Sequence, residues 1–214
     1  MILVTLQQVK AILSYLLILI TIFLIASHII WPTIDLSTPI FFTVVVIFII
    51  YFRIDSVKET TLCLIVKDNK VLMMLRNKKK NDVHKDKYNG LGGRLEKGES
   101  KRSCVIREVL EEAGVVLTRY EYVGKVRFKN FGHKIGKEIM YCYVAYEYKG
   151  EIGDCDEGEL VWIDKDQILS LPLWEGDKYF IMNIVNNRKF KGLLEYKDDK
   201  VVNYDFYVHN PFDY

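Results

Sequence analysis

The charged residues of this chain are distributed so unevenly that no single fold environment suits all of it. The sequence has 214 residues, with 30 Lys or Arg and 28 Asp or Glu, yet residues 1–52 contain only Lys10 and Asp35. A single soluble domain is therefore excluded, because its surface needs polar groups along the whole chain. The chain is 50% hydrophobic and 13% aromatic, which excludes wholesale disorder. Its net charge of +2 excludes a nucleic-acid binder that relies on bulk charge.

Two apolar runs in this uncharged segment predict a pair of transmembrane helices. The first, residues 12–31, has 20 residues without a formal charge, which is enough to span a hydrocarbon layer about 30 Å thick. The second, residues 36–52, has 17 residues and lies at the short end for a span. The second run is also compatible with a re-entrant or interfacial segment, or with a core helix of a soluble protein.

The few charges near the two runs predict their orientation. Lys10 precedes the first run and Arg53 follows the second, whereas the connecting loop carries only Asp35. Positive residues favour the cytoplasmic side, so we expect both ends of the hairpin to lie in the cytoplasm. Residues 1–55 are then a multi-pass anchor in the bilayer of the cell membrane, and residues 56–214 form a domain that faces the cytoplasm.

The second part of the chain has the pattern of a mixed α+β domain. Strand-like runs and helical periodicity alternate irregularly, without the repeated strand–helix–strand units of a parallel α/β fold. A long polar loop with glycines at its end is expected over residues 76–93. Strands are expected over 60–66, 71–75, 120–128, 138–148, 160–163, 192–197 and 201–207, and helices over 100–113 and 175–187.

The helix expected over residues 100–113 carries a cluster of acidic side chains. Three of them share one face, at positions i, i+3 and i+4: Glu108, Glu111 and Glu112. Four apolar residues fall on the opposite face and are expected to be buried: Ile106, Val109, Leu110 and Ala113. Clustered carboxylates repel one another unless a cation joins them, and a hard divalent ion such as Mg²⁺ or Mn²⁺ suits such ligands. A solvated acidic helix face is the alternative for these three residues alone.

The spacing of this helix and the loop before it resembles the Nudix box. Gly93 is followed after five residues by Glu99, and then after seven residues by Arg107, which directly precedes Glu108. The pattern closes with the two further glutamates and Gly114. Flanking stretches, among them GLGGRLE and LPLWEGD, resemble MutT-type 8-oxo-dGTP diphosphatases within the Nudix hydrolases. The resemblance covers about residues 59–210 and leaves the apolar runs outside it.

The resemblance implies an α/β/α sandwich with a mixed sheet and a hydrolase that acts on phosphorus anhydrides. It implies a metal-dependent cleavage of a nucleoside triphosphate such as 8-oxo-dGTP to the monophosphate and pyrophosphate, which sanitises the nucleotide pool and supports DNA repair. The metal, Mg²⁺ or Mn²⁺, would be held by Glu108, Glu111, Glu112 and, outside the box, Glu157. Arg107 would orient the catalytic glutamates Glu111 and Glu112, and Glu99 would support it. Glu157 has a plain loop carboxylate as its alternative reading.

The same resemblance indicates residues for substrate recognition. Asn89, Trp174 and Asp177 are expected at the base, since an indole can stack on a purine and polar side chains can bond to its edge. The alternative interpretation is that this stretch is the start of a surface helix and that Trp174 packs in the core. Arg76 or Lys78 is expected to reach the phosphates, and the backbone at Gly92 and Gly93 is expected to approach the ligand closely. Other members of the basic loop are expected to be solvated or to face anionic headgroups.

Two other functions fit the sequence. The predicted anchor favours a different diphosphate substrate, such as a nucleotide-sugar, a dinucleotide or a lipid diphosphate, because a soluble nucleotide pool needs no tether. An inactive nucleotide sensor is disfavoured by the complete set of glutamates. No nucleic-acid partner is expected, and the oligomeric state is not predicted.

Overall fold

A computed structural model describes residues 15, 20, 57–80, 82–131 and 137–209 of the chain. Contacts divide the chain into two units, Met1–Ser56 and Val57–Tyr214. The two predicted membrane spans lie almost wholly outside the described residues. Within the described residues, no helix is long and apolar enough to cross a membrane. The membrane hairpin therefore stays a prediction.

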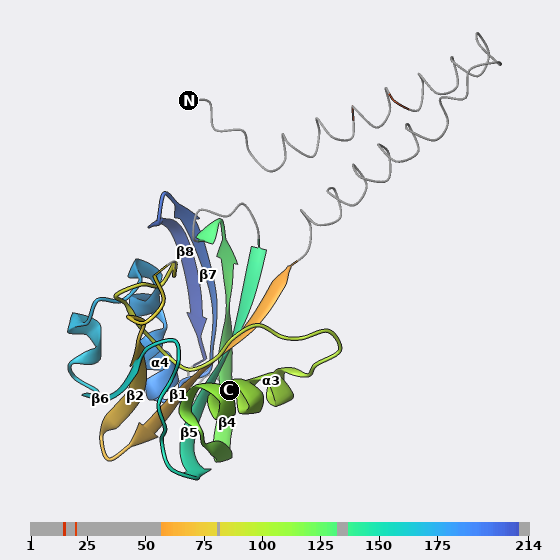
Figure 1. Cartoon of the computed structure of the whole chain (residues 1–214). Helices are drawn as coiled ribbons and strands as arrows, with labels where there is room; N and C mark the ends of the chain where they lie inside the picture. The colour runs from red at the N-terminus through yellow and green to blue at the C-terminus, as the bar shows by residue number, and fades with distance from the viewer. Residues whose placement is uncertain (1–14, 16–19, 21–56, 81, 132–136, 210–214) are drawn as a thin grey trace, which may run out of the picture. The chain divides into compact units, whose positions relative to one another are not determined.

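One mixed sheet forms the centre of the second unit (Figure 1). Its strands follow the order β3-β2-β1-β5-β4-β7-β8, and β6 pairs with β2. The pairs β1–β5 and β4–β7 are parallel, and the remaining pairs are antiparallel. The strands are β1 Lys58–Lys67, β2 Lys70–Leu75, β3 Tyr88–Asn89, β4 Val116–Lys129, β5 Lys137–Lys149, β6 Glu159–Asp164, β7 Phe190–Lys197 and β8 Lys200–Val208.

The hairpin of β1 and β2 shows why the sequence folds in this way locally. Both strands are rich in branched and apolar residues, and both are buried along most of their length. Asp68 and Asn69 connect them with φ values of 49° and 62°, a left-handed conformation that these two residue types tolerate well. The predicted hairpin is confirmed, and so are the other predicted strands, with small shifts at their ends.

Helices cover both faces of the sheet and make the expected sandwich. Helix α3, Lys101–Ala113, packs Val105 and Val109 against Ile65 and other residues on one face. Helix α4, Ile181–Val185, packs against the other face, where the core includes Leu64. The α+β class with a mixed sheet is therefore confirmed, and the larger helix, α3, crosses in front of the strands in Figure 1.

Two details of the helices differ from the sequence prediction. The helix expected over residues 175–187 is split into a 3-10 turn, Glu175–Tyr179, and α4, because Phe180 leaves the helical region with φ −128° to bury its ring. On α3, Leu110 was expected to be buried but is 46% exposed. The helix is rotated so that Cys104, Val105 and Glu112 face inward together with Val109 and Ala113. Two 3-10 segments are described in all, Ile168–Ser170 and the turn just named.

Candidate active site

A glycine-containing loop is held between strand β1 and helix α3. On the strand side, the N–H of Thr61 donates to the carbonyl of Gly93 at 2.8 Å, and the N–H of Cys63 donates to that of Leu91 at 2.6 Å. On the helix side, the N–H of Gly92 donates to Oε2 of Glu112 at 2.7 Å. These bonds fix the loop at the side of the helix that carries the glutamates.

Two glycines make this close approach sterically feasible. Gly92 has φ 142°, and a Cβ added there would collide with the carbonyl of Thr61. A Cβ at Gly93 would collide with the carboxylate of Glu108. Gly92 thus lies against the backbone of Thr61 and Gly93 against the side chain of Glu108, and the close approach of this loop to a ligand stays a prediction.

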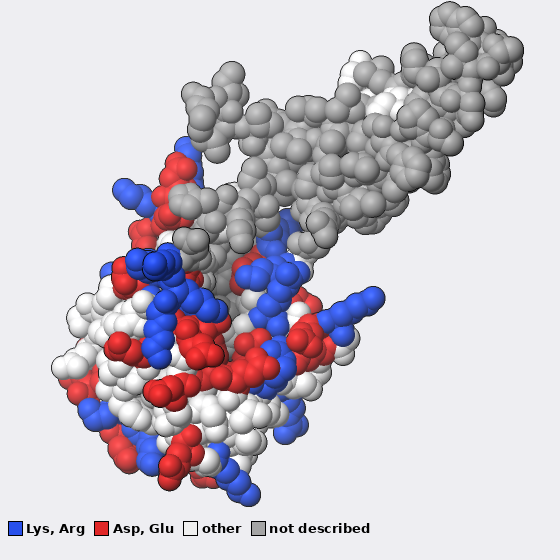
Figure 2. Space-filling model, viewed as in Figure 1, with Lys and Arg blue, Asp and Glu red and all other residues white. Residues whose placement is uncertain are grey.

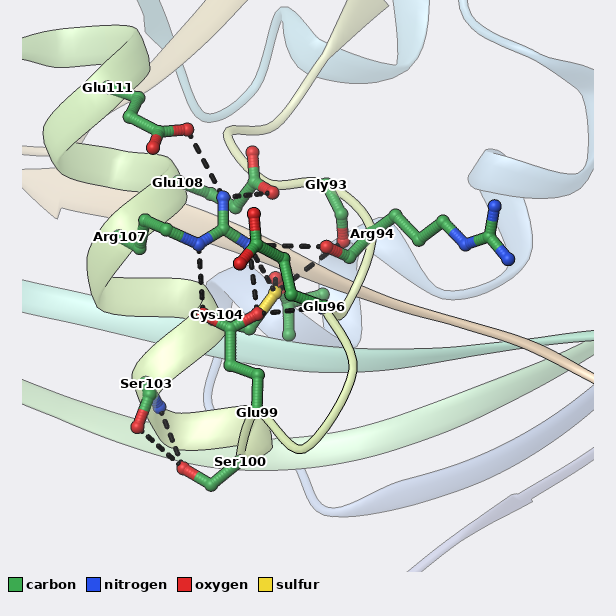
Figure 3. Close-up of polar contacts among 11 residues, drawn as sticks. Gly93, Arg94, Glu96, Glu99, Ser100, Ser103, Cys104, Arg107, Glu108 and Glu111 are labelled. Carbon is green, nitrogen blue, oxygen red and sulfur yellow. Dashed lines mark hydrogen bonds and ion pairs between the residues drawn. The ribbon is translucent and has the colours of Figure 1, made fainter.

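Arg107 joins three glutamates through one guanidinium group (Figure 3). It bonds both oxygens of Glu99 at 2.9 Å each, Glu108 at 2.8 Å and Glu111 at 3.2 Å. It also donates to the carbonyl of Arg94 at 3.2 Å, which ties the helix to the loop. The hydrogen bonds from Arg107, and one from the N–H of Glu96, lower the pKa of Glu99 to about 2. The predicted orienting contacts of Arg107 with Glu111 and Glu99 are present in the structure.

No cation among the described residues is bonded to Glu112 in this way. Its side chain is nearly buried, with 8% of the residue exposed, and its described hydrogen bond comes from the backbone of Gly92. Burial, together with the charges of Glu157 and Glu108, raises the pKa of Glu112 to about 8, against the opposing effects of the Gly92 hydrogen bond and of Arg76. Burial likewise raises the pKa of Glu108. This surplus of negative charge is what a divalent cation would neutralise, so the donor set fits a hard metal ion.

The glutamates do not converge on one point in the structure. Among the described residues, no group of three or more His, Cys, Asp or Glu side chains stands close enough to hold a metal ion. Arg107 holds Glu108 and Glu111, while Glu112 turns toward Gly92. Figure 2 shows acidic and basic side chains close together on the face that carries α3, which agrees with this internal pairing.

Glu157 lies near the box, although it is far from it in sequence. The charge of Glu157 raises the pKa of Glu112. Glu157 forms ion pairs with Arg76 and Lys79. Burial alone would raise the pKa of Glu157, but Lys79 and Arg76 lower it overall. Lys79 was expected only as a member of the basic loop, and no role was predicted for Asp82, which accepts a hydrogen bond from Nε of Arg76 at 2.7 Å.

The two cations expected at the phosphates are engaged with the protein itself. Arg76 pairs with Asp82 and Glu157, and both Arg76 and Asp82 are largely buried. Lys78 donates to the carbonyl of Cys155 at 2.7 Å. They fasten the loop after β2 to the segment before β6, with Arg76 largely buried and Lys78 exposed. A substrate contact by either residue stays a prediction.

The residues expected at the base occupy neighbouring segments. Trp174 is nearly buried, and its Nε1 donates to Nδ1 of His84 at 2.9 Å. Phe131 packs edge-on against its ring at 4.9 Å between centroids, and Nζ of Lys87 lies 4.8 Å from the ring centroid. Lys87, one residue before Tyr88 and two positions before Asn89, was expected only as a solvated or headgroup-facing member of the basic loop. The indole edge is therefore occupied by a histidine, as in the alternative core reading.

Asp177 lies in the 3-10 turn that follows Trp174, within Leu171–Asp177, which we call the tryptophan segment, and Asn89 lies in β3. Burial raises the pKa of Asp177 to about 7, although the N–H of Trp174 and the charge of Lys87 act in the opposite direction. Asn89 lies in β3, where the adjacent N–H of Tyr88 donates to the carbonyl of Pro172 at 3.1 Å. Strand β3 and the tryptophan segment, which are far apart in sequence, are thus brought together.

Comparison with known proteins gives relatives over this part of the chain. An oxidized purine nucleoside triphosphate hydrolase of Danio rerio is 29% identical over 147 residues, which are 68% of this chain and 90% of that protein. An uncharacterized Nudix hydrolase of Bacillus subtilis is 31% identical over 127 residues, 58% of this chain and 77% of that protein. The crystal structure of a mutator MutT protein from Bacillus halodurans superposes with a TM-score of 0.61 and 28% identity. The superposed region comprises 70% of this chain and 97% of the Bacillus halodurans chain.

The family comparison agrees with the geometry of the site. The NUDIX domain family matches residues 57–184, a range that contains the loop, helix α3, Glu157 and the tryptophan segment. The chain therefore belongs to the Nudix family and is a hydrolase that acts on phosphorus anhydrides.

Proposed function

We propose that this hydrolase cleaves a nucleoside triphosphate with an oxidised purine base, such as 8-oxo-dGTP, to the monophosphate and pyrophosphate, and so removes damaged nucleotides from the pool. The observation that carries the proposal is the pairing of Arg107 with Glu99, Glu108 and Glu111, beside the buried Glu112, whose pKa is raised to about 8. The relative of Danio rerio, whose name states an oxidized purine nucleoside triphosphate as its substrate, supports the choice of substrate.

A divalent ion, Mg²⁺ or Mn²⁺, completes the proposed site. Glu108, Glu111, Glu112 and Glu157 would hold it, with a backbone carbonyl of the glycine loop as a further ligand. When bound, the ion polarises the phosphoryl group and acidifies the attacking water. Arg107 orients the glutamates through its planar fork of donors, and Glu99 in turn holds Arg107 in place.

The tryptophan segment is proposed to bind the base. Trp174 supplies an aromatic surface whose orientation is set by His84 and Phe131. Asp177 supplies a carboxyl group that burial keeps partly protonated near neutral pH, so it can donate as well as accept a hydrogen bond. Asn89 offers an amide that can bond the edge of a purine.

We also propose that residues 12–31 and 36–52 anchor the enzyme in the cell membrane, with the Nudix domain in the cytoplasm. The length and lack of charge of the two runs support this. The anchor favours a second candidate function, hydrolysis of a lipid diphosphate, a nucleotide-sugar or a dinucleotide by the same site. An inactive sensor is less well supported, because the four glutamates of the box and Arg107 are all present.

The test is a substrate panel with the full-length chain in detergent micelles. Oxidised and ordinary purine triphosphates, a nucleotide-sugar, a dinucleotide and a lipid diphosphate are incubated with Mg²⁺ or with a chelator, and the products are separated by chromatography. We expect the oxidised purine to be consumed fastest, with release of pyrophosphate that depends on the metal. Rapid turnover of the lipid diphosphate with the oxidised purine untouched would favour the second function instead.

A further inference from the structure

The face of the sheet that carries α3 continues past the helix onto β4 and β7, where it is basic. Lys125 on β4 is the Cα partner of Tyr141 on one side and of Lys191 on the other. Tyr141 belongs to the core under α3, whereas the next β4 residue, Val126, belongs to the opposite core. Side chains alternate between faces along a strand, so Lys125, Lys191 and Arg127 share the face that carries α3.

These cations outnumber the carboxylates described on the same face, Glu59, Glu195 and Asp205, of which Glu195 already pairs with Lys129. Among the described residues, no ion pair involves Lys125, Arg127 or Lys191, although Lys125 and Lys191 are neighbours across two strands. Like charges directly opposite each other in a sheet are destabilising, so an external anion would relieve the repulsion. Two more cations extend the group. Lys137 is the partner of Lys129 in the register, and Lys101 of α3 places its Nζ 4.0 Å from the ring centroid of Tyr141. We call Lys101, Lys125, Arg127, Lys137 and Lys191 the basic sheet face.

Exposed tyrosines border this basic sheet face. Tyr207 on β8 is the partner of Lys191 and is 59% exposed, and Tyr122 on β4 is 44% exposed. A tyrosine has an apolar ring and a polar hydroxyl, and it is enriched where protein meets the headgroup region of a bilayer. In Figure 2, basic side chains lie on the same face as α3.

We propose that the basic sheet face docks on the anionic lipid headgroups of the membrane. The short stretch of chain between the predicted membrane span and β1 favours lipid headgroups over other polyanions as the binding partner. The second predicted span ends at Phe52 and β1 begins at Lys58. The residues between them reach about 20 Å at most, at roughly 3.3–3.6 Å per residue. Lys58 lies at the same end of the sheet as Lys129 and Lys137. Lys58 pairs with Glu138 across β1 and β5, and the neighbouring residue Lys137 pairs with Lys129 across β5 and β4.

This docking rests on the proposed anchor for its choice of partner, but its test does not need the anchor. The fragment 57–214 contains both hydrophobic cores. The MutT protein of Bacillus halodurans, of which 97% is covered by this chain, shows that such a domain folds without a segment like residues 1–56. The fragment can therefore be mixed with vesicles and sedimented, with no predicted span present.

The fragment is expected to bind vesicles that contain phosphatidylglycerol and to be released by added salt. It should not bind vesicles of phosphatidylcholine alone. A cation near an anionic surface strengthens binding by a factor of about five, so the triple variant Lys125→Gln, Arg127→Gln, Lys191→Gln should bind about 100-fold more weakly. The matched control, Lys67→Gln, Lys149→Gln, Lys165→Gln, removes the same charge at the other end of the sheet and should bind like the wild type.

Three results would overturn the docking proposal. They are equal binding to neutral vesicles, equal weakening by the two triple variants, and tighter binding to a single-stranded oligonucleotide that the first variant abolishes. Circular dichroism and nucleotide hydrolysis without vesicles should be unchanged in both variants, which separates docking from folding. A wild-type fragment that binds vesicles but hydrolyses no nucleotide would contradict the proposed function and leave the docking confirmed.

Discussion

The backbone N–H of Gly92 donates to the carboxylate of Glu112 at 2.7 Å, across 20 residues of sequence. This bond joins the loop to the one box glutamate of α3 that is nearly buried. A carboxylate in this position is costly as an anion, because burial and two neighbouring carboxylates oppose its charge. The proposed site thus contains a carboxyl group whose anionic form is costly until a cation binds it, which suits a group that works by binding a cation.

Replacing Glu112 by Gln tests this role directly. The amide oxygen can still accept the hydrogen bond from Gly92, but the negative charge is lost. We expect metal-dependent hydrolysis to fall by at least about 100-fold, since even groups that only support a metal ligand cost 10–100-fold. Thermal stability should be unchanged or higher. The control is Glu147→Gln, which removes an exposed carboxylate on β5 that pairs with Arg119 at 3.3 Å. Full activity of the Glu112 variant would refute its assignment as a ligand.

The two glycines of the loop should respond differently to alanine. At Gly92 a Cβ meets the backbone of Thr61, which cannot move aside, and φ is 142°. We expect Gly92→Ala to lower the free energy of unfolding by about 1–3 kcal/mol in urea titrations. At Gly93 the Cβ meets the flexible end of Glu108, so Gly93→Ala should keep its stability and lose activity. Gly153→Ala is the control, because nothing lies within 4 Å of its added Cβ. Equal stability of all three variants would contradict the prediction.

Arg107 should not be replaceable by lysine. Its guanidinium binds both oxygens of Glu99 and also reaches Glu108 and Glu111, which a single ammonium group cannot reproduce. We expect Arg107→Lys to reduce kcat by about 10–100-fold with little change in KM. The double variant with Glu99→Gln should lose little more than Arg107→Lys alone, because the two residues act as one unit. Strictly additive losses in kcat would show that they act separately.

Asp177 should make the stability of the protein depend on pH. Its pKa is raised to about 7 from an ordinary value near 3.8, mainly by burial. The folded protein therefore retains a proton that the unfolded chain releases, and stability falls as pH rises from about 4 to about 7, then levels off. Asp177→Asn should remove this part of the dependence. Urea midpoints measured from pH 5 to pH 8 should show the variant gaining on the wild type as pH rises, and parallel curves would contradict the raised pKa.

Trp174 should determine substrate affinity through its ring and its position. Trp174→Ala removes the stacking surface and should raise KM about 5–150-fold, the range expected for loss of 1–3 kcal/mol of base stacking. Trp174→Phe keeps an aromatic ring but loses the 2.9 Å bond to His84, so its KM should be intermediate. Steady-state kinetics with an oxidised and an ordinary purine triphosphate measure both effects. An alanine variant with unchanged KM would favour the reading of Trp174 as a core residue.

Much of the fold and the acidic face could be predicted from sequence because both depend on local periodicity. The β1–β2 hairpin follows from two apolar runs separated by Asp68 and Asn69, and their left-handed φ values agree. Helix α3 begins after Ser100, whose side chain accepts from the N–H of Ser103, and it ends at Gly114 with φ 71°. Helical spacing by itself places Glu108 and Glu112 on one side of that helix.

Tertiary packing decided what each of those residues experiences. Neighbouring positions such as Glu111 and Glu112 share a helix face, yet the side chain of the first is 58% exposed and the second residue 8%. The difference arises because the glycine loop covers only the second. Arg76 and Glu157 form an ion pair across 81 positions of sequence, which no local pattern indicates.

The sequence by itself determined the family, the strands, the glutamate helix and the uncharged first segment, since these depend on residue types at short, regular spacing. Only the tertiary structure decided that Glu112 is buried without a cation, that Trp174 bonds His84, and that Lys125 lies beside Lys191. Each of these relationships joins segments that chain folding brings together from a distance. Burial and electrostatic repulsion are properties of such neighbours in space, so they arise only once the sheet and its helices have packed.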